Sequence, residues 1–463
     1  MTAPRPVPSA PLLRGSVVPS FAYTTIKDRL PVILAKVIDH FVRRQHREHI
    51  KGSSAAATED AAATAAAAAE DTAWDDRSAS ELRRIRDDIA ALKYAMARDR
   101  PLEPLVAAAD ASADEATDVA LWNAALDELD AAERSWFKAP WLFIECFMYR
   151  LLRQSLLATT TWRDYDLFES EKQASLFGSA ESILRMASAA LGVRAAADRD
   201  AAAELIQFSL WGNQSDLSLF VNAKHDEAHK HQISGKDQLA SSSSSIIVND
   251  MDAVLDKLAA IRTGTVVIVL DNAGFELFGD LCLADYITQT TECTVVFEGK
   301  LFPWFVSDTT ARDFDFVVDE CALLADKREH DNLREAVARW RAWVASGRWV
   351  LRFDPFWTTP FPFWRMPERA PALLKQLSDA QLVMFKGDLN YRKMVHDAAW
   401  PPHTPFAEAI GPIASSGIAP FVMLRTCKSD TVAGLRPGQA AELDAIDKDW
   451  MVNGKFGIIQ LHQ

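Results

Sequence analysis

The chain has 463 residues, of which 49% are hydrophobic and 25% are charged, and its formal net charge is -14. This composition excludes an intrinsically disordered chain, and the length exceeds one ordinary hydrophobic core, so we expect two packed regions. Nucleic acids and anionic membranes require a basic binding surface, and such an acidic chain disfavours both as partners. A small anionic substrate in a locally basic pocket remains compatible with this charge.

The N-terminal segment and the cysteines indicate the compartment. Residues 1–20 are rich in proline and lack the basic and apolar regions of a secretory signal, so we expect a disordered lead-in. No apolar run reaches the ~18 residues of a membrane-spanning helix. The five widely spaced cysteines favour neither disulfides nor a zinc site: Cys146, Cys282, Cys293, Cys321 and Cys427. We expect a soluble protein of the cytoplasm, with the nucleus as a second location.

Residues 21–210 have the periodicity of a helical domain. In the segment 25–49, apolar residues at Ile33, Val37 and Phe41 lie on one helical face. Residues 52–72 are an alanine-rich, low-complexity stretch with few side chains to bury, which predicts a surface insertion. The remainder, to residue 210, alternates helical patterns with short breaks and contains no convincing strand.

After Trp211 the pattern changes to short β-rich runs separated by segments of helical length. Such alternation predicts a mainly parallel sheet covered by helices on both faces. We therefore expect a Rossmann-like, three-layer α/β/α domain over residues 211–463, with the polar tract 224–245 as a surface loop. The runs are VVIVL (266–270), TVVFEG (294–299), DFDFVV (313–318), WVLRF (349–353), QLVMF (381–385), FVML (421–424) and GIIQL (457–461).

Asp271 and Asn272 directly follow the apolar run 266–270 and precede a helical pattern. Asp308 comes just after a second apolar and aromatic run, FPWFVSDTT. Ligands of open α/β sheets bind beyond the carboxyl ends of the strands, and two carboxylates with one amide suit Mg²⁺ or Mn²⁺ better than zinc. The alternative for Asp271 and Asn272 is a cap on the helix that follows.

Two basic segments also follow predicted strands. Residues 386–393, KGDLNYRK, combine a glycine with many hydrogen-bond donors, which is typical of an anion-binding loop, and the alternative is a surface turn. Residues 425–428, RTCK, end another strand, and Lys428 could neutralise charge on a transferred phosphoryl group. Glu276 is either a group near the metal or substrate or a solvated carboxylate. We interpret these strand ends as one site.

Three other motifs are weaker. His225 and His229 lie four residues apart, but no glutamate directly follows the first histidine, so a loop is favoured over a zinc helix. The run VVIVLDNAG has Ala273 where haloacid dehalogenase enzymes carry a second aspartate. The sequence also lacks G-x-G-x-x-G, the usual signature of a nicotinamide site, and S-adenosylmethionine sites usually carry a similar glycine-rich turn.

From Phe21 onward, the chain resembles the metal-dependent damage-control phosphatases, once classified only as a domain of unknown function. The RTxK signature at residues 425–428 resembles the subgroup that includes the yeast sugar-phosphate phosphatase and the vertebrate protein described as an acidic-residue methyltransferase. The resemblance rests on these ordered segments: SFAYTTIKDRLPVIL, PWLFIECFMYR, SLWGNQSDLS, VLDNAGFEL, PWFVSDTT, FKGDLNYRK, RTCK and GKFGIIQ. The alanine-rich insertion and the polar loop depart from the family pattern and carry no motif.

The resemblance implies a helical N-terminal region, a Rossmann-like domain and a defined set of site residues. It implies that Asp271, Asn272 and Asp308 bind Mn²⁺, Mg²⁺, Co²⁺ or Ni²⁺. The residues that it implies contact the substrate are Asn213, Asp271, Asn272, Glu276, Asp308, Asp388, Leu389, Asn390, Tyr391, Arg392 and Lys428.

The resulting hypothesis is a metal-dependent phosphatase for small phosphosugars such as fructose 1-phosphate or fructose 6-phosphate. Asp271, Asp308 and Lys428 are the expected catalytic residues, and we expect a monomer with no nucleic-acid or membrane partner. One alternative is a protein-glutamate methyltransferase that uses S-adenosylmethionine, and the absent glycine-rich loop counts against it. A second alternative is a non-catalytic protein that binds phosphorylated ligands.

Overall fold

The computed structural model describes residues 6–55, 76–108, 111–192, 198–212 and 244–463. The chain forms two compact units, a helical unit, Leu13–Phe168, and a sheet unit that combines Met1–Leu12 with Glu169–Gln463. We expected the second domain to begin at residue 211, whereas the sheet unit already includes the helices that follow Glu169. The reason is packing, because Ser209 in the last of these helices donates a hydrogen bond to buried Asp280.

The helical unit contains helices and no strand among its described residues, in agreement with its sequence pattern. The helix α5 lies at its centre and is buried along most of its length. Trp122 of α4 packs against Phe143 and Phe147 of α5, with ring centroids 6.1 and 5.9 Å apart. The elements are α1 (Phe21–Thr24), a π-helical turn (Thr25–Arg29), α2 (Leu30–Ala55), α3 (Asp76–Ala97), α4 (Ala113–Asp127), a 3-10 turn (Ala131–Glu133) and α5 (Trp141–Leu157).

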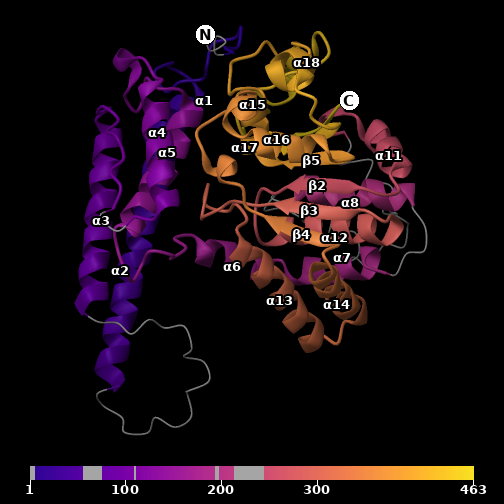
Figure 1. The fold of residues 1–463 in the computed structure, drawn as a ribbon, viewed down its shortest axis with the longest axis horizontal. Helices are drawn as coiled ribbons and strands as arrows, with labels where there is room; N and C mark the ends of the chain where they lie inside the picture. Colours follow the sequence, from indigo (N-terminus) through magenta and orange to yellow (C-terminus); the bar gives the residue numbers. More distant parts are fainter. Residues whose placement is uncertain (1–5, 56–75, 109–110, 193–197, 213–243) are drawn as a thin grey trace. The chain divides into compact units, whose positions relative to one another are not determined.

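The sheet unit contains a seven-stranded sheet in the order β1-β7-β6-β5-β2-β3-β4 within the described residues. The strands β6, β5, β2, β3 and β4 are parallel, β7 is antiparallel to β6, and β1 is parallel to β7. Figure 1 shows β5, β2, β3 and β4 side by side in this order. The mainly parallel sheet predicted from the sequence is therefore confirmed. The strands are β1 (Ile246–Asn249), β2 (Thr265–Val269), β3 (Thr294–Glu298), β4 (Trp349–Arg352), β5 (Leu382–Lys386), β6 (Phe421–Thr426) and β7 (Gly457–His462).

Helical segments cover both faces of the sheet, which gives the expected three layers. Met384 of β5 faces a core that includes residues of α7, α8 and α11–α14. Its neighbour Phe385 points to the opposite face, where its ring lies 5.4 Å from that of Phe363. The helices are α6 (Glu169–Gly178), α7 (Ala180–Ala190), α8 (Arg199–Trp211), α11 (Met251–Ala260), α12 (Phe275–Thr290), α13 (Ala311–Lys327), α14 (Asp331–Ser346), α15 (Met366–Arg369), α16 (Pro371–Ser378), α17 (Gly387–Met394), α18 (Phe406–Ala409) and α19 (Gln439–Ile446).

Residues 313–318, DFDFVV, were predicted as a strand, and this prediction was wrong because they belong to α13. Alternating aspartate and phenylalanine imitate the two-residue period of a strand. The buried residues of α13 instead include Phe314, Val317, Val318 and Cys321, which follow helical spacing. Asp313 takes part in a capping box at the start of this helix, so its charge belongs to the helix N-terminus.

Residues 6–20, part of the expected disordered lead-in, are ordered in the described structure and partly paired with the sheet unit. Leu12 forms an isolated antiparallel bridge with Ala398, and the Ala399 N–H donates to the carbonyl of Pro11 at 2.8 Å. This pairing joins the first residues of the chain to the turn that follows α17.

The five cysteines are buried, and none of them forms a disulfide within the described residues. Among the helices that the structure describes, none has both the length and the apolarity required to cross a membrane.

We predict that Asp285→Asn destabilises the sheet unit by about 3 kcal/mol, because it breaks a buried ion pair. Asp285 of α12 accepts hydrogen bonds from Trp340 at 2.9 Å, from Arg339 at 3.1 Å and from Gln289 at 2.6 Å. Urea denaturation measures the change in the free energy of unfolding.

The matched control is Asp319→Asn, which breaks an exposed pair between α13 and α14, Asp319 with Arg341 at 2.7 Å. Exposed pairs contribute about 0–1 kcal/mol, so this variant should retain nearly all of its stability. Equal losses in the two variants would contradict the assigned role of Asp285.

Candidate active site

Asp271 and Asn272 lie in the short turn between β2 and α12, and both side chains are buried. The N-cap of α12 is Gly274, whose φ angle is 70°, and no side chain caps this helix. The helix-cap alternative for Asp271 and Asn272 is therefore wrong. Instead, the Asn272 amide donates to Asp271 Oδ2 at 2.6 Å.

Asp308 reaches the same edge of the sheet through a loop. It was predicted to follow a strand directly, but β3 ends at Glu298 and the aromatic run 302–306 belongs to the connection. Asp308 forms an antiparallel bridge with Asn272, and the Thr309 N–H donates to the Asp271 carbonyl at 2.8 Å. This pairing brings Asp308 beside Asp271, although Asp308 does not directly follow a strand.

The loop before Asp308 contains two residues with left-handed backbone angles, Phe305 at φ 44° and Val306 at φ 69°. This conformation costs roughly 1–2 kcal/mol per non-glycine residue, and it is least favourable for a β-branched side chain such as valine. The strained turn presents Ser307, whose hydroxyl donates to Asn272 Oδ1 at 2.5 Å and whose carbonyl accepts from the Ala273 N–H. The strained loop thus lies beside the groups that it holds in position.

A buried lysine, Lys300, neutralises part of the charge of these carboxylates. Its Nζ donates to the carbonyl of Leu270 at 2.9 Å and lies 3.2 Å from Asp308 Oδ2. Burial raises the pKa of Asp308 to about 6, although Lys300 opposes this shift. Burial, together with the charges of Glu276 and Asp308, raises the pKa of Asp271 well above its ordinary value.

Glu276 is buried in the first turn of α12, so the solvated-carboxylate alternative is wrong. Its Oε2 accepts from Asn272 Nδ2 at 2.8 Å, and its Oε1 lies 2.8 Å from Lys386 Nζ. Lys386 also pairs with Asp280 at 2.9 Å, and Ser209 donates to Asp280 at 2.5 Å. A continuous hydrogen-bonded network therefore connects α8 to the Asn272 amide.

The segment predicted as an anion-binding loop, residues 386–393, is instead the end of β5 and the helix α17. Val269 of β2 is paired with Phe385 of β5, so Asp271 and Gly387 both lie two residues beyond that pair. Gly387 has φ 84°, and a Cβ atom added there would lie 1.9 Å from Asp271 Oδ2. The N-terminus of α17 therefore touches the Asp271 carboxylate.

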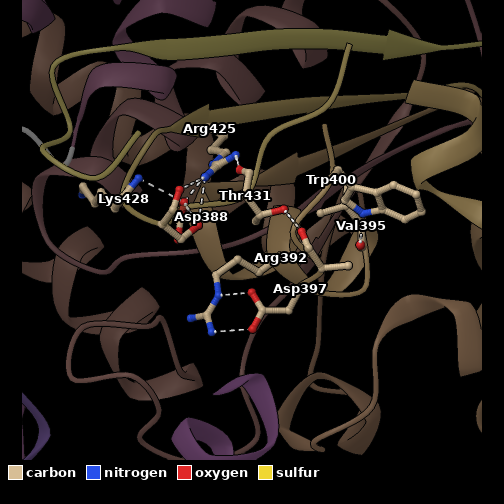
Figure 2. Close-up of polar contacts among 10 residues, drawn as sticks. Asp388, Arg392, Val395, Asp397, Trp400, Arg425, Lys428 and Thr431 are labelled. Atoms are coloured by element: carbon tan, nitrogen blue, oxygen red, sulfur yellow. Dashed lines mark hydrogen bonds and ion pairs between the residues drawn. The ribbon is translucent and has the colours of Figure 1, made fainter. Parts of the chain in front are cut away.

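Asp388, in the first turn of α17, holds the RTCK segment at the end of β6 in place. Its Oδ1 accepts from Arg425 Nε at 2.7 Å, from the Lys428 backbone N–H at 3.1 Å and from Ser429 Oγ at 3.0 Å (Figure 2). The guanidinium of Arg425 also lies over the ring of Tyr391, 4.1 Å from its centroid. Arg425 and Asp388 thus form one buried ion pair at the base of the site.

The side chains of residues 389–392 are buried, and three of them form hydrogen bonds inside the protein. Leu389 is 5% exposed, Asn390 donates to the Lys386 carbonyl at 2.7 Å, and the Tyr391 hydroxyl accepts from the Ala433 N–H at 3.0 Å. Arg392 is also buried and pairs with Asp397. Lys428 is only half-buried, and its positive charge opposes the rise in the pKa of Asp271 that burial causes.

Asn213 lies outside the described residues, as do His225, His229 and most of the polar tract 224–245. The last described residue before Asn213 is Gly212, and a Cβ atom there would lie 2.8 Å from Glu276 Cα. The end of α8 therefore packs against the first turn of α12.

The residues present fit a hard divalent cation. Asp308 Oδ2 is buried and lies 3.2 Å from Lys300 Nζ, and the carboxyl of Asp271 is buried beside it. Within the described ranges, no group of three or more His, Cys, Asp or Glu side chains is arranged to bind a metal, so the candidate set is two carboxylates and an amide. Oxygen ligands of this kind suit Mg²⁺ or Mn²⁺.

Sequence reasoning did not select Lys300, Asp280 or Ser307 as site residues, and it included Lys386 only as the first residue of the predicted anion-binding loop 386–393. Lysines and serines near strand ends are common, and their burial becomes visible only in the fold. One signal was present, because Asp280 follows Glu276 by four residues and therefore lies on the same face of α12.

We predict that Gly387→Ala is more destabilising than Gly417→Ala, a control with a nearly equal φ of 79° and open space around it. The control measures left-handed strain alone, about 1–2 kcal/mol. At residue 387 the new methyl group also displaces Asp271, so we expect a loss of about 3 kcal/mol or more. Equal changes in chemical denaturation would show that the close approach is unimportant.

We also predict that Asp388 makes stability depend on pH. Burial opposes its ionisation, but Arg425 and Arg392 outweigh burial and hold the pKa of Asp388 below its ordinary value. The resulting stability is complete above the unfolded-state pKa of about 3.9 and is lost as the pH falls through the folded-state value.

Asp388→Asn should therefore reduce stability by about 3 kcal/mol at neutral pH, since it leaves Arg425 buried without its partner. The difference from wild type should shrink below about pH 4. Urea denaturation across this range measures both free energies of unfolding, and a constant difference would contradict the assignment.

Comparison with known proteins identifies the family of the chain. Residues 25–443 match the family described as the damage-control phosphatase ARMT1-like domain. The chain is 35% identical over 475 residues to damage-control phosphatase ARMT1 of Rattus norvegicus, which covers 98% of both chains. It is 33% identical over 470 residues to the Homo sapiens protein of that name, with 97% of both chains covered.

A solved structure of a DUF89 family protein from Pyrococcus horikoshii is also similar, with a TM-score of 0.39 and 13% sequence identity over 75% of this chain and 90% of that one. The family match and the relatives each extend over most of the chain. The chain belongs to the ARMT1-like damage-control phosphatase family.

Proposed function

We propose that this protein is a metal-dependent phosphatase that hydrolyses small phosphosugars such as fructose 1-phosphate or fructose 6-phosphate. One observation carries the proposal, namely that the buried carboxylate of Asp271, with Asp308 beside it, touches the N-terminus of α17 beyond the parallel strands. Carboxylates attract a cation and a helix N-terminus attracts a phosphate group. A metal-dependent phosphatase requires both attractions at one point.

In this proposal Asp271, Asn272 and Asp308 hold the divalent cation, with Mn²⁺ or Mg²⁺ favoured and Co²⁺ or Ni²⁺ as further options. A bound divalent ion withdraws charge from the phosphate group and favours its attack by water. The protein contributes a dry, preorganised set of oxygen atoms. Ser307 and Glu276 hold the Asn272 amide between them, and Lys300 holds Asp308.

The phosphate group would lie at the first turn of α17. The side chains of Leu389, Asn390 and Tyr391 are buried, so their contribution to substrate binding comes from the backbone. The first N–H groups of a helix have no acceptor within the helix, and they point toward its N-terminal end. These groups are the donors that α17 offers to phosphate oxygens.

Lys428 supplies the accessible positive charge of the site. It is half-buried, and its charge acts on the Asp271 carboxyl. Arg392 lies on the same face of α17 as Asp388, one turn later, and adds a second cation. Both residues would balance the negative charge that develops on the phosphoryl oxygens during transfer.

We predict that phosphate release from fructose 1-phosphate requires added Mn²⁺ and is abolished by a chelator. Asp271→Asn should reduce the rate roughly a hundredfold or more, because it removes one carboxylate from the cation and changes the local charge. Release of inorganic phosphate under saturating substrate is the measurement. The control is Asp319→Asn, which changes an exposed aspartate on α13 and should leave the rate unchanged.

Full activity of Asp271→Asn, or activity without any divalent ion, would refute the proposal. The same preparations distinguish the alternatives. Tight, stoichiometric binding of S-adenosylmethionine in calorimetry, without phosphate release, would favour a methyltransferase. Binding of phosphosugars without turnover would favour a non-catalytic protein that binds phosphorylated ligands.

A further inference from the structure

The chain reverses sharply after α17, within the residues that follow Arg392. Val395 caps the helix, and the next two residues, His396 and Asp397, have φ angles of 61° and 49°. The Asp397 N–H donates to the Arg392 carbonyl at 2.7 Å, which closes the turn. Two consecutive left-handed residues without a glycine cost roughly 1–2 kcal/mol each, so the surrounding structure must hold this turn.

The turn brings the Asp397 carboxylate onto the guanidinium of Arg392. Nε of Arg392 lies 2.8 Å from Asp397 Oδ1, and Nη2 lies 3.0 Å from Oδ2. Figure 2 shows these two contacts as parallel lines between the planar groups. The side chains are only 4% and 3% exposed. A paired fork of this kind fixes the plane of a guanidinium, which one hydrogen bond cannot do.

Two tryptophans hold the end of α17 where the turn begins. The indole N–H of Trp364 donates to the Met394 carbonyl at 3.0 Å, and that of Trp400 donates to the Val395 carbonyl at 2.8 Å. The Trp364 ring also packs edge-on against His396, with centroids 5.0 Å apart. These contacts satisfy helix carbonyls that the helix itself leaves unpaired.

Residues beyond the turn connect it to the other guanidinium of the site. Thr431 Oγ1 donates to the Ala398 carbonyl at 2.6 Å, and the Thr431 carbonyl accepts from Arg425 Nη1 at 2.7 Å (Figure 2). On the other side, Ala399 pairs with Pro11, as described above. Arg392 and Arg425 are therefore placed by one connected scaffold.

We propose that Asp397 is a positioning residue that orients Arg392 toward the phosphate of the substrate. The proposal rests on the proposed function, because it takes the phosphate to lie at α17. Arg392 is one turn from Asp388 on α17, and its charge lowers the Asp388 pKa, so it lies near the RTCK segment. Asp397 fixes two donors of Arg392 and thereby the direction in which the rest of its guanidinium is presented.

The test uses inorganic phosphate as the probe and the full chain with Mn²⁺. Calorimetry measures the phosphate affinity of wild type, Arg392→Gln, Asp397→Asn and the double variant. We expect each single variant to weaken phosphate binding about tenfold, and the double variant to be no weaker than Arg392→Gln alone, because Asp397 acts only through Arg392. The KM for fructose 1-phosphate should rise by a similar factor.

Asp285→Asn is the matched control, since it also breaks a buried aspartate–arginine pair of the sheet unit. It should lower stability and leave phosphate affinity unchanged. Asp397→Glu keeps the charge but displaces the carboxylate, and it replaces Asp397→Asn if that variant does not fold. We expect weaker phosphate binding from Asp397→Glu as well, because the guanidinium must move.

Wild-type affinity in both Asp397 variants, or additive losses in the double variant, would overturn the inference. This failure differs from failure of the proposed function. Phosphate that binds in an Asp397-dependent way, without any hydrolysis, would refute the phosphatase and support the positioning role. Hydrolysis with an unaltered KM in Asp397→Asn would support the phosphatase and refute the positioning role.

Discussion

The close approach of Gly387 to the Asp271 carboxylate is the constraint on which the site depends. Adjacent parallel strands place both residues two positions beyond the Val269–Phe385 pair. Only a residue without a side chain can hold φ 84° at that distance from a carboxylate. The positive end of α17 therefore meets the negative charge of Asp271, and a phosphate and a cation can be attracted to neighbouring points.

Buried lysines are the second requirement, because carboxylates removed from water need compensating charges. Lys300 lies beside Asp308, and Lys386 lies between Glu276 and Asp280. Burial alone would lower the pKa of Lys386, but Asp280 and Glu276 outweigh it and keep this lysine charged. The pairs are costly to desolvate and weak evidence for stability. Their more direct effect is geometric, since each lysine fixes the carboxylate that it contacts.

Most of the architecture could be predicted from the sequence because strand and helix periodicities differ, and six of the seven proposed strand runs correspond to strands. The errors have physical causes. Residues 313–318 alternate aspartate and phenylalanine in a helix, and β1 has only four residues. Asp308 was selected as a candidate for the wrong local reason, since its position depends on a strained loop. Lys300 gave no signal, and the ion pairs of Lys386 were not foreseen, because burial of a lysine is a property of the fold.

The short helix α17 explains why one segment can serve both packing and binding. Tyr391 packs beneath Arg425, while Asp388 and Arg392 share another face of the helix. Asp388 offsets part of the charge of Arg425, and Asp397 offsets part of that of Arg392. The half-buried Lys428 and the backbone of α17 are therefore the main attraction for an anion. In the proposed function, the backbone of α17 recognises a phosphate group without regard to the molecule that carries it, so discrimination between substrates would come from residues outside α17.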